Sequence, residues 1–497
     1  MRIISLKIGG YKLFKPSPKI RLGKEMQLLI GVNGSGKSTV LEAIAIIFSD
    51  VKRYCEDTKR RERKFDFYIE YSFVNNYIIE ETSTTQDTRT SINHVFLSSS
   101  FETGLEYAMF VNKIKIETPQ EMYKYLPDNL ILYYSGSCDT LEKIAKEIEA
   151  EQAEDLFRKR SKEQVHRVIN SLAKNIIYIK KEYYPLLFAL NYIDKKQVLP
   201  LSNKKFQISS IVFYIKKPNF TDNNDYKKLY NLSGFLRPYL NNLLKHSYGV
   251  DEDIETKEPF FIVDYHRGIL EAVEELDGLT HDQRFNQTRY IAFHLISLLF
   301  RVGLIKKIDI SISDMHENKY SIDNFSEGEQ QLIILDALKN ILCLKNSILC
   351  LDEPDAYLHP KRQRELFPHI QELYTESETQ IIATSHSPFV AQSVPLNSIL
   401  LFNKNGGVVK VIEDELNSYI AIANELFGVK TEFSVEIENE FEKFWLLRQK
   451  ILSNESYNTQ ELIELIKILQ SRGDEVKAIV NRELAQLRRV KGNEFFI

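Results

Sequence analysis

The stretch GVNGSGKS, residues 31–38, constrains this chain more than any other part of it. An apolar run, Leu28 to Ile30, precedes the stretch, and an apolar sequence with helical spacing follows it, which predicts a turn between a buried strand and a helix. Glycines at positions 31, 34 and 36 allow the backbone N–H groups to turn inward around phosphate groups. A glycine-rich turn can form without a ligand, but Gly-Lys-Ser would then have no use. The sequence therefore predicts a phosphate-binding P-loop.

Each polar residue of this loop has an expected task. Lys37 would meet the β- and γ-phosphate oxygens of ATP, and the Ser38 hydroxyl is a candidate Mg²⁺ ligand. Asn33 would lie beside the γ-phosphate, close to the position of an attacking water. The predicted nucleotide-binding residues are Asn33, Gly34, Ser35, Gly36, Lys37, Ser38 and Thr39.

The segment SILCLDEPDAYLHP, residues 347–360, contains a second buried strand that ends in two carboxylates. Four apolar residues, 348–351, run directly into Asp352 and Glu353, and two adjacent carboxylates are costly to bury without a cation. Asp352 fits a ligand of Mg²⁺ or its water, as at the end of a Walker B strand, and Glu353 fits the general base that orients the hydrolytic water. An acidic turn before Pro354 is the alternative, but it does not explain the hydrophobic run.

Two further segments follow the same logic. In TQIIATSHSPFV, residues 379–390, an apolar strand ends at Ser385 and His386. A single histidine is most often structural, but beside the other motifs His386 fits a residue that hydrogen-bonds the γ-phosphate. In FSEGEQQ, residues 325–331, polar and acidic residues start an apolar-periodic helix. Helix capping explains that composition, and an anion site at the helix N-terminus is the alternative.

In order and spacing, these four segments together resemble the ATP-binding-cassette (ABC) ATPases, in particular their soluble SMC-like and OLD-like branch. The resemblance implies an α/β fold: an ABC-type P-loop ATPase head with a mainly helical insertion and a helical C-terminal tail. It implies two heads that dimerise head to tail, with Mg²⁺ and ATP bound between them. Glu353 and His386 would be the catalytic residues, Ser38 and Asp352 the metal ligands, and Asp355 the D-loop residue. Ser326, Glu327, Gly328, Glu329 and Gln330 would be the signature, which acts in trans on the ATP of the neighbouring subunit.

The sequence departs from a transporter-type LSGGQ signature, because Phe325, Glu327 and Glu329 replace the leucine, the second glycine and the glutamine. This pattern is common in the soluble branch. The segment LPDNLILYYSGSCDTL has the strand and turn of a Q-loop but no glutamine after them. Ser135 or Ser137 is the candidate substitute.

The spacing of the motifs divides the chain into four parts. We expect an N-terminal head lobe at 1–140, an insertion at 141–305, a C-terminal head lobe at 306–415 and a helical tail at 416–497. The insertion contains one charged helical stretch, LEKIAKEIEAEQAEDLFRKRSKEQVHRVINSLAKN, without the sustained heptads of a long coiled coil. The strand-like IVFYIKK and helices near 226–246 and 284–301 follow it. After the head, SILLFNKNGGVVKVIED predicts a hairpin, and three amphipathic helices form the tail.

Within the soluble branch, the short insertion and helical tail resemble PtuA, the ATPase of Septu antiphage systems and of some retrons. That resemblance implies a bacterial antiphage function in which the ATPase controls a separate HNH nuclease similar to PtuB. No Toprim-type carboxylate set follows the head, and Asp251 with Asp253 or His281 with Asp282 lack partner ligands nearby in the sequence. We therefore expect no nuclease site in the chain itself. The alternatives are a RecF- or SMC-like DNA-repair ATPase that acts as a DNA-binding clamp, and a structural scaffold that only uses nucleotide for assembly.

Composition limits the partners only weakly. A net charge of −4 does not indicate a nucleic-acid-binding protein, although the basic cluster TKRRERK, residues 58–64, could contact DNA or RNA phosphates; a solvated charged turn explains it more simply. The four cysteines form no CxxC pair, which indicates reduced thiols. No apolar run is long enough to cross a bilayer and no signal peptide is visible, so we expect a cytoplasmic protein without membrane contact.

Overall fold

The computed structural model divides into two compact units, Met1–Tyr419 and Ile420–Ile497, and each is described by itself. The residues that the structure describes are 1–14, 19–56, 65–78, 88–99, 107–136, 140–144, 146–147, 175–193, 197–198, 205–216, 236–253, 259–263, 268–276, 279, 281, 287–314, 319–375, 378–403, 407–410, 433–453 and 456–491.

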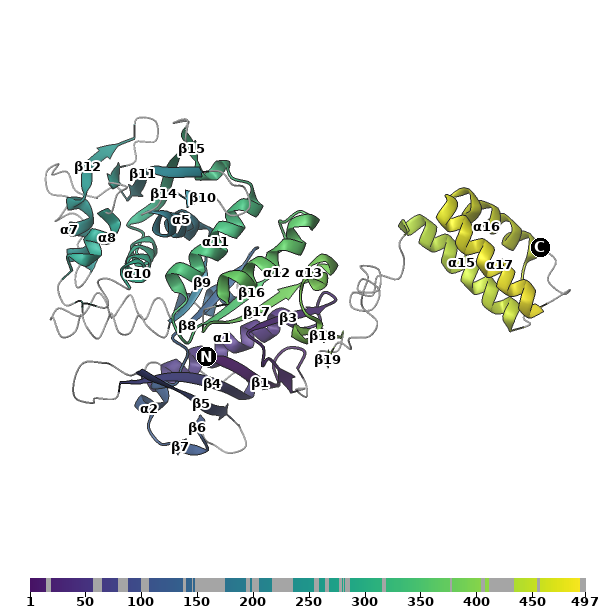
Figure 1. Cartoon of the computed structure of the whole chain (residues 1–497), viewed down its shortest axis with the longest axis horizontal. Helices are drawn as coiled ribbons and strands as arrows, with labels where there is room; N and C mark the ends of the chain where they lie inside the picture. The colour runs from purple at the N-terminus through teal and green to yellow at the C-terminus, as the bar shows by residue number, and fades with distance from the viewer. Residues whose placement is uncertain are drawn as a thin grey trace. The chain divides into compact units, whose positions relative to one another are not determined.

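A seven-stranded sheet forms the centre of the first unit (Figure 1). Its strands, in spatial order, are β19 (Val408–Lys410), β18 (Ile399–Phe402), β3 (Met26–Gly31), β17 (Gln380–Ser385), β16 (Ile348–Asp352), β8 (Asn129–Tyr134) and β9 (Asn175–Ile179). All neighbours pair in parallel except β18 and β19, which form the antiparallel hairpin that the sequence predicted. Because the carboxyl ends of parallel strands meet at one edge, the residues that follow β3, β16 and β17 converge there.

A second, antiparallel sheet packs with the helix that follows the P-loop. Its strands, in spatial order, are β2 (Ile20–Arg21), β1 (Arg2–Gly9), β4 (Asp66–Ile78), β5 (Thr88–Ser99), β6 (Ala108–Val111) and β7 (Ile114–Ile116). Helix α1 (Lys37–Cys55) lies between this sheet and the central sheet (Figure 1), and Phe48 meets Tyr71 edge to face at 5.9 Å. Both rings are buried in one continuous core with residues of β1, β4, β8 and β16. The short helix α2 (Pro119–Lys124) adds Met122 to that core.

On the opposite face of the central sheet lie α11 (Glu327–Leu342), α12 (Pro360–Tyr374) and α13 (Pro388–Ser393) (Figure 1). The three-residue 3₁₀ turns of this unit are η1 (Lys181–Tyr183), η2 (Ile322–Asn324) and η3 (Leu396–Ser398). The Tyr374 hydroxyl donates to the Leu335 carbonyl at 3.2 Å and so joins α12 to α11. The signature segment is therefore the N-terminal end of a helix packed within the head.

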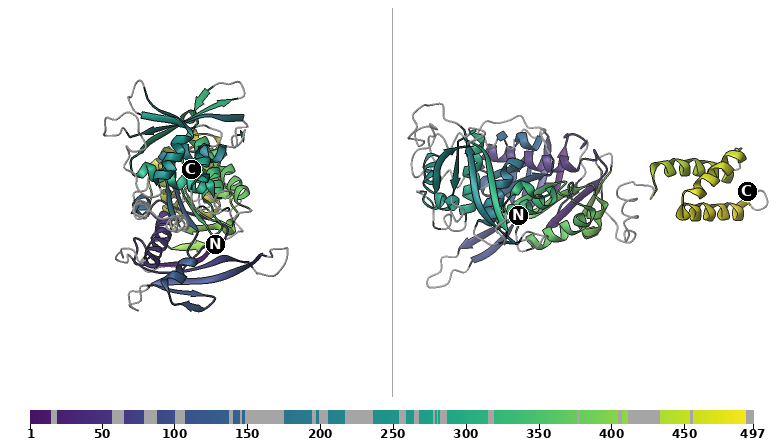
Figure 2. Two further views of the ribbon diagram at one scale, coloured as in Figure 1. Left: turned by 90° about the vertical axis from the view of Figure 1, so that its left-hand side faces the viewer. Right: turned by 90° about the horizontal axis from the view of Figure 1, so that it is seen from above.

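The insertion contains a third sheet as well as helices, visible in two orientations in Figures 1 and 2. The strands are β10 (Gln197–Val198), β11 (Lys205–Ile215), β12 (Ser247–Glu252), β13 (Pro259–Val263), β14 (Ile305–Asp314) and β15 (Lys319–Ser321), and the helices are α5 (Tyr184–Tyr192), α7 (Leu236–Lys245), α8 (Gly268–Glu274) and α10 (Thr288–Arg301). The sequence-based description of a mainly helical insertion is thus incomplete, because only β11 was expected. Short strands such as β12 and β13 carry little alternation, and they are stabilised by pairing, β13 with β11 and β12 with β13.

Two strands do not fit the predicted limits of the insertion. β9 lies within residues 141–305 but extends the central sheet beside β8, and the boundary at residue 305 falls on the first residue of β14. Most of the charged stretch 141–174 lies outside the described residues. The division of the chain at these positions stays a prediction.

Polar contacts connect the insertion to α11. Asn191 on α5 donates to Asp336 Oδ2 at 2.8 Å, the Tyr192 hydroxyl donates to the same oxygen at 3.3 Å, and Asn340 donates to Asn191 Oδ1 at 2.9 Å. Burial, followed by the charge of Asp336, raises the pKa of Tyr192. Helix α11 is therefore fixed to the insertion in its middle turns.

The second unit contains the helices α15 (Val435–Leu452), α16 (Thr459–Ser471) and α17 (Asp474–Lys491). Their apolar faces form a separate core that includes Phe444, Leu462 and Val480. Arg472 bridges back to Glu436 and Glu440 at 2.9 and 2.6 Å. Trp445, Leu446 and Leu452 on α15 stay exposed.

Candidate nucleotide-binding and hydrolysis site

The P-loop joins β3 to α1 through three glycines with positive φ. The φ values are 149° at Gly31, 76° at Gly34 and 101° at Gly36, which are unfavourable for residues with a Cβ atom. At Gly31 a Cβ atom would also overlap the Phe402 carbonyl oxygen of the neighbouring strand β18. Asn33 and Gly34 are exposed at the tip of the loop, while Ser35, Lys37 and Thr39 are buried. The loop therefore has the backbone conformation that the motif requires.

Lys37, the first residue of α1, lies inside this loop. Its Nζ donates to the carbonyls of Gly31 at 3.0 Å and Val32 at 3.2 Å, and lies 3.5 Å from Nδ1 of His386. Burial lowers the pKa of Lys37 to about 8, and the nearby carboxylates Glu353 and Asp352 oppose that shift. The side chain thus keeps its positive charge at neutral pH, at the centre of the loop.

Ser38 and Asp352 bring a hydroxyl and a carboxylate oxygen together. Ser38 Oγ donates to Asp352 Oδ1 at 2.9 Å, although the two residues are far apart in the sequence. Burial raises the pKa of Asp352, and hydrogen bonds from Thr384 and Ser38 oppose that shift. Magnesium prefers hard oxygen ligands and typically takes one or two from the protein, with water and phosphate completing its shell. This donor pair fits Mg²⁺, which would be held by Ser38 and Asp352.

Glu353 and His386 form a second pair at the same sheet edge. His386 Nε2 lies 3.0 Å from Glu353 Oε1, and each side chain is about one-third exposed (33% and 34%). The hydrogen bond from His386 lowers the pKa of Glu353, while burial acts in the opposite direction. Glu353 also adopts φ 51°, a left-handed conformation that is uncommon for a residue with a side chain. An ionised carboxylate that faces solvent can accept a proton from a bound water.

Thr384 is the residue that sequence reasoning missed at this edge. It is fully buried on β17, opposite Asp352 on β16. Its hydroxyl donates to Asp352 Oδ1 and accepts a hydrogen bond from the Glu353 backbone N–H at 3.1 Å. The sequence shows Thr384 only as a residue of ATSHSP, two positions before His386. Its contact with Asp352 becomes evident only when the register of β17 against β16 is known.

Asp355 is connected to the same edge through its neighbours. Its Oδ2 accepts from Ser385 Oγ at 3.0 Å, and its backbone carbonyl accepts from Gln363 at 3.1 Å. Burial raises the pKa of Asp355 to about 6, with the Ser385 hydrogen bond opposing. The D-loop position is therefore linked to β17, one residue before His386.

The side chains of the signature segment form their hydrogen bonds within the segment itself. Ser326 caps α11: its Oγ accepts from the Glu329 backbone N–H at 3.3 Å, while Glu329 Oε2 accepts from the Ser326 backbone N–H and hydroxyl at 3.0 and 2.9 Å. Gln330 donates to the Phe325 carbonyl, Glu327 is exposed, and a Cβ atom at Gly328 would lie 2.9 Å from Leu358 Cδ2. Within the parts of the chain described here, no hydrogen bond or ion pair links these residues to the P-loop. Capping and close packing are thus the observed uses of Ser326, Glu329 and Gly328.

The remaining candidates differ in their distance from this edge. Ser135 adjoins it and donates its backbone N–H to the Asp352 carbonyl at 3.3 Å, whereas Asp251 is exposed on β12 in the third sheet. Ser137, Asp282 and the basic cluster 58–64 lie outside the described residues. Over the ranges that the structure describes, no group of three or more His, Cys, Asp or Glu side chains could hold a metal ion. In those ranges, too, no helix combines the length and the hydrophobicity needed to cross a membrane.

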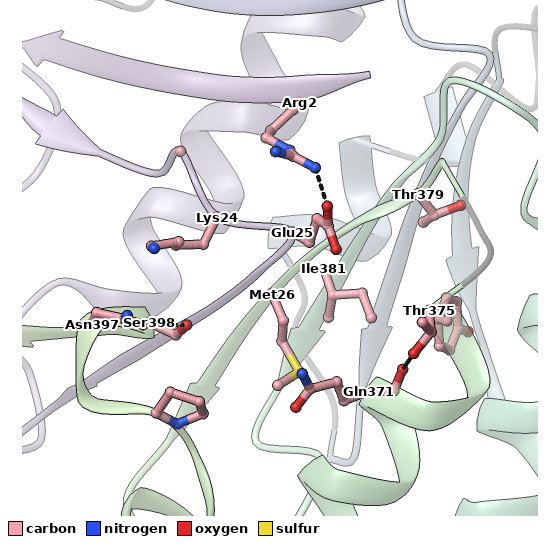
Figure 3. Close-up of a pocket in the computed structure, with 13 residues that line it drawn as sticks. Arg2, Lys24, Glu25, Met26, Gln371, Thr375, Thr379, Ile381, Asn397 and Ser398 are labelled. Atoms are coloured by element: carbon pink, nitrogen blue, oxygen red, sulfur yellow. Dashed lines mark hydrogen bonds and ion pairs between the residues drawn. The ribbon is translucent and has the colours of Figure 1, made fainter.

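A cavity of about 540 Å³ opens at the opposite end of the central strands, where β3 and β17 begin. Figure 3 shows Arg2 and Glu25 at this cavity, with Arg2 Nη2 donating to Glu25 Oε1 at 2.5 Å. Met26, Ile381 and Gln371 also line it. Because the P-loop follows the last residue of β3, this cavity is separate from the candidate nucleotide site.

The fold and the site define a P-loop ATPase. Residues 1–391 match the family AAA_15, described as an AAA ATPase domain, and the chain belongs to that family. The chain is therefore an ATPase.

The individual proteins to which the chain is similar share low sequence identity with it. The chain is 21% identical to the retron Vc95 probable ATPase of Vibrio cholerae serotype O1 biovar El Tor over 452 residues, which cover 86% of this chain and 79% of that protein. It is 25% identical to the retron Ec83 probable ATPase of Escherichia coli, over 37% of this chain and 35% of that protein. Among solved structures, the SMC head domain from Thermotoga maritima is 12% identical with a TM-score of 0.33, covering 83% of this chain and 100% of that one.

Proposed function

We propose that this chain is the ATPase of a bacterial antiphage defence system and that its nucleotide state controls a separate nuclease. The observation that carries the proposal is the similarity to the retron Vc95 probable ATPase, which extends over 86% of the chain and thus beyond the P-loop motifs. Similarity to the retron Ec83 probable ATPase supports the same assignment.

In the proposed reaction, each residue at the sheet edge has one task. Lys37 and the loop amides bind the β- and γ-phosphates, and Ser38 with Asp352 holds Mg²⁺, which would offset the phosphate charge. Glu353 accepts the proton of the attacking water. His386, 3.0 Å from Glu353 and 3.5 Å from Lys37, keeps that carboxylate oriented and reaches toward the γ-phosphate.

We further propose that two heads dimerise head to tail, so that the signature of one subunit contacts the ATP of the other. The N-terminus of α11 is exposed at Ser326 and Glu327, which leaves it accessible to a second subunit. Helix N-termini attract phosphate through their free amides and the helix dipole. Asp355 would lie at the interface between the heads.

The proposed partner is an HNH nuclease similar to PtuB, as in Septu systems and some retrons, and the complex would act in the cytoplasm. The three-helix tail is our candidate docking unit, because Leu446 on α15 is 59% exposed beside Trp445. A large apolar side chain exposed on a self-contained bundle can anchor another protein. Contact of the assembly with DNA or RNA belongs to the same proposal.

The test is to assay the purified chain on plasmid, linear DNA and tRNA with Mg²⁺ or Mn²⁺, alone and then with the product of the adjacent reading frame. We expect ATP hydrolysis by the chain alone and nucleic-acid cleavage only with the second protein. A Leu446→Asp variant should keep ATPase activity but lose the association. Cleavage by the chain alone that is abolished when Asp251 and Asp253 are replaced would overturn the proposal. An adjacent reading frame whose product is not a nuclease and does not bind the chain would favour the DNA-clamp alternative.

A further inference from the structure

Two atoms with different roles, Asp352 Oδ1 and the Glu353 backbone nitrogen, contact one buried hydroxyl, that of Thr384. Thr384 and Asp352 are Cα partners in the parallel pairing of β17 with β16, so their side chains lie next to each other. The Thr384 hydroxyl donates to Asp352 Oδ1, the same oxygen that accepts from Ser38 at 2.9 Å. It also accepts from the Glu353 backbone N–H at 3.1 Å.

The Thr384 hydroxyl donates one hydrogen bond and accepts another. A threonine hydroxyl has one proton to donate, and here the proton is committed to Asp352. The lone pairs receive the N–H of Glu353, a residue whose φ of 51° is unfavourable without local support. The bond therefore fixes the direction of the Asp352 carboxylate and the backbone conformation of Glu353 at the same time.

We propose that Thr384 is a positioning residue for ATP hydrolysis, which sets the Mg²⁺-binding carboxylate of Asp352 and the backbone of Glu353 relative to each other. This inference rests on the proposed roles of Asp352 and Glu353. Thr384 acts through these residues, because its hydroxyl is hydrogen-bonded to Asp352 and to the Glu353 backbone N–H and its side chain is fully buried. A serine retains both hydrogen bonds, whereas a valine retains the shape and loses both.

The experiment compares Thr384→Val with Thr384→Ser in the full chain. We expect kcat for ATP to fall about 10- to 100-fold in the valine variant, the range that small misplacements of catalytic groups cause. KM should change less than about threefold, because Lys37 and the loop amides are untouched. The serine variant should keep kcat within about threefold of wild type.

A readout without turnover accompanies the kinetics. The affinity for a non-hydrolysable ATP analogue is measured with Mg²⁺ and with EDTA. In wild type and in the serine variant, Mg²⁺ should strengthen binding by a similar factor, and in the valine variant this factor should shrink severalfold. Ser347→Ala is the matched control, because Ser347 is a fully buried hydroxyl at the other end of β16 and its Oγ has no hydrogen-bond partner among the described residues.

The outcomes separate this inference from the proposed function. Wild-type kcat and Mg²⁺ dependence in Thr384→Val, or an equal loss in the serine variant, would overturn the role of Thr384 alone. If Glu353→Gln also hydrolyses ATP normally, the assignment of the general base fails instead. Should Thr384→Val unfold, Thr384→Ala replaces it, and a folded alanine variant with normal kcat counts against the inference.

Discussion

At the scale of single residues, the nucleotide edge concentrates charges and strain that a structural role would not need. Lys37 is buried with its ammonium 3.5 Å from His386, and Glu353 is one of few non-glycine residues in the described part of the chain with a positive φ. Such arrangements persist where the surrounding structure enforces them, and they are frequent at functional sites.

Replacing Lys37 by alanine should weaken ATP binding by about 10- to 100-fold, because it removes a charged hydrogen-bond donor worth about 1.5–3 kcal/mol. Titration of a fluorescent ATP analogue measures the effect. Lys7→Ala is the matched control, since Lys7 is an exposed lysine on β1. Unchanged affinity in the Lys37 variant would show that phosphate binds elsewhere.

Replacing Glu353 by glutamine should reduce ATP hydrolysis by about 100-fold or more while leaving ATP binding intact, because the amide keeps the shape but cannot accept the proton. The variant should accumulate as an ATP-bound dimer, visible as an earlier elution in size-exclusion chromatography with ATP. Hydrolysis at the wild-type rate would mean that another group is the base.

Sequence reasoning predicted the residues of this edge better than it predicted their contacts. Lys37, Ser38, Asp352, Glu353 and His386 stand in motifs with defined spacing, and the structure brings them together. Thr384 could not be found in that way, because its importance depends on which residue of β16 lies opposite it. Parallel register is set by packing across the sheet, which a single strand does not encode.

At the scale of elements, the dependence of strands on their neighbours also explains why the sheet of the insertion was not predicted. The strands of the central sheet that carry the motifs are apolar runs and are visible in the sequence, whereas β9 was not predicted as a strand of this sheet. β12 and β13 are short, β13 depends on β11 for its pairing and β12, at the edge, depends on β13, so their sequences alone indicate little. The helices near 284–301 and in the tail have a clear helical period, and they occur at α10 and α15–α17.

Helix α10 contains a buried histidine that makes stability depend on pH. Burial lowers the pKa of His294 to about 3, and Arg301 and Lys52 add to the shift. Below pH 6.5, His294 is protonated in the unfolded chain but stays neutral in the folded chain. Its contribution to the free energy of unfolding is therefore fully present above pH 6.5 and is lost as pH falls toward 3. We expect a loss of about 1 kcal/mol between pH 7.5 and 5.5.

His294→Gln should remove that loss, because the amide does not titrate. Urea unfolding gives the free energy of unfolding of the variant and of wild type at pH 7.5 and at pH 5.5. The difference between the two proteins should change between these pH values. His94→Gln, an exposed position on β5, is the control and should leave the slope unchanged. An identical pH slope in the His294 variant and wild type would contradict the assignment.

At the scale of the whole molecule, the proposed dimer makes each ATP site depend on two subunits. Ser326→Arg should leave ATP binding by the P-loop largely intact and stop hydrolysis, because the signature would act on the neighbour's nucleotide. Mixing it with Lys37→Ala should restore turnover, since each mixed dimer contains one site with an intact P-loop and an intact signature.

The measurement is the rate of ATP hydrolysis by the mixture of the two variants, compared with the rate of each variant alone. The mixed dimers are first verified by co-purification of two different affinity tags. If verified mixed dimers remain inactive, the signature does not act in trans.

The anchoring of α11 to the insertion has a mechanical consequence. A 16-residue helix is a rigid rod about 24 Å long. Its first turn carries the signature, which is exposed at Ser326 and Glu327, and Asp336, in its middle turns, is hydrogen-bonded to Asn191 and Tyr192 of the insertion. In the proposed closure of two heads, a displacement of the first turn would either carry the insertion with it or break these hydrogen bonds. The insertion would thus report, at a distance from the nucleotide, whether the ATP sites are closed.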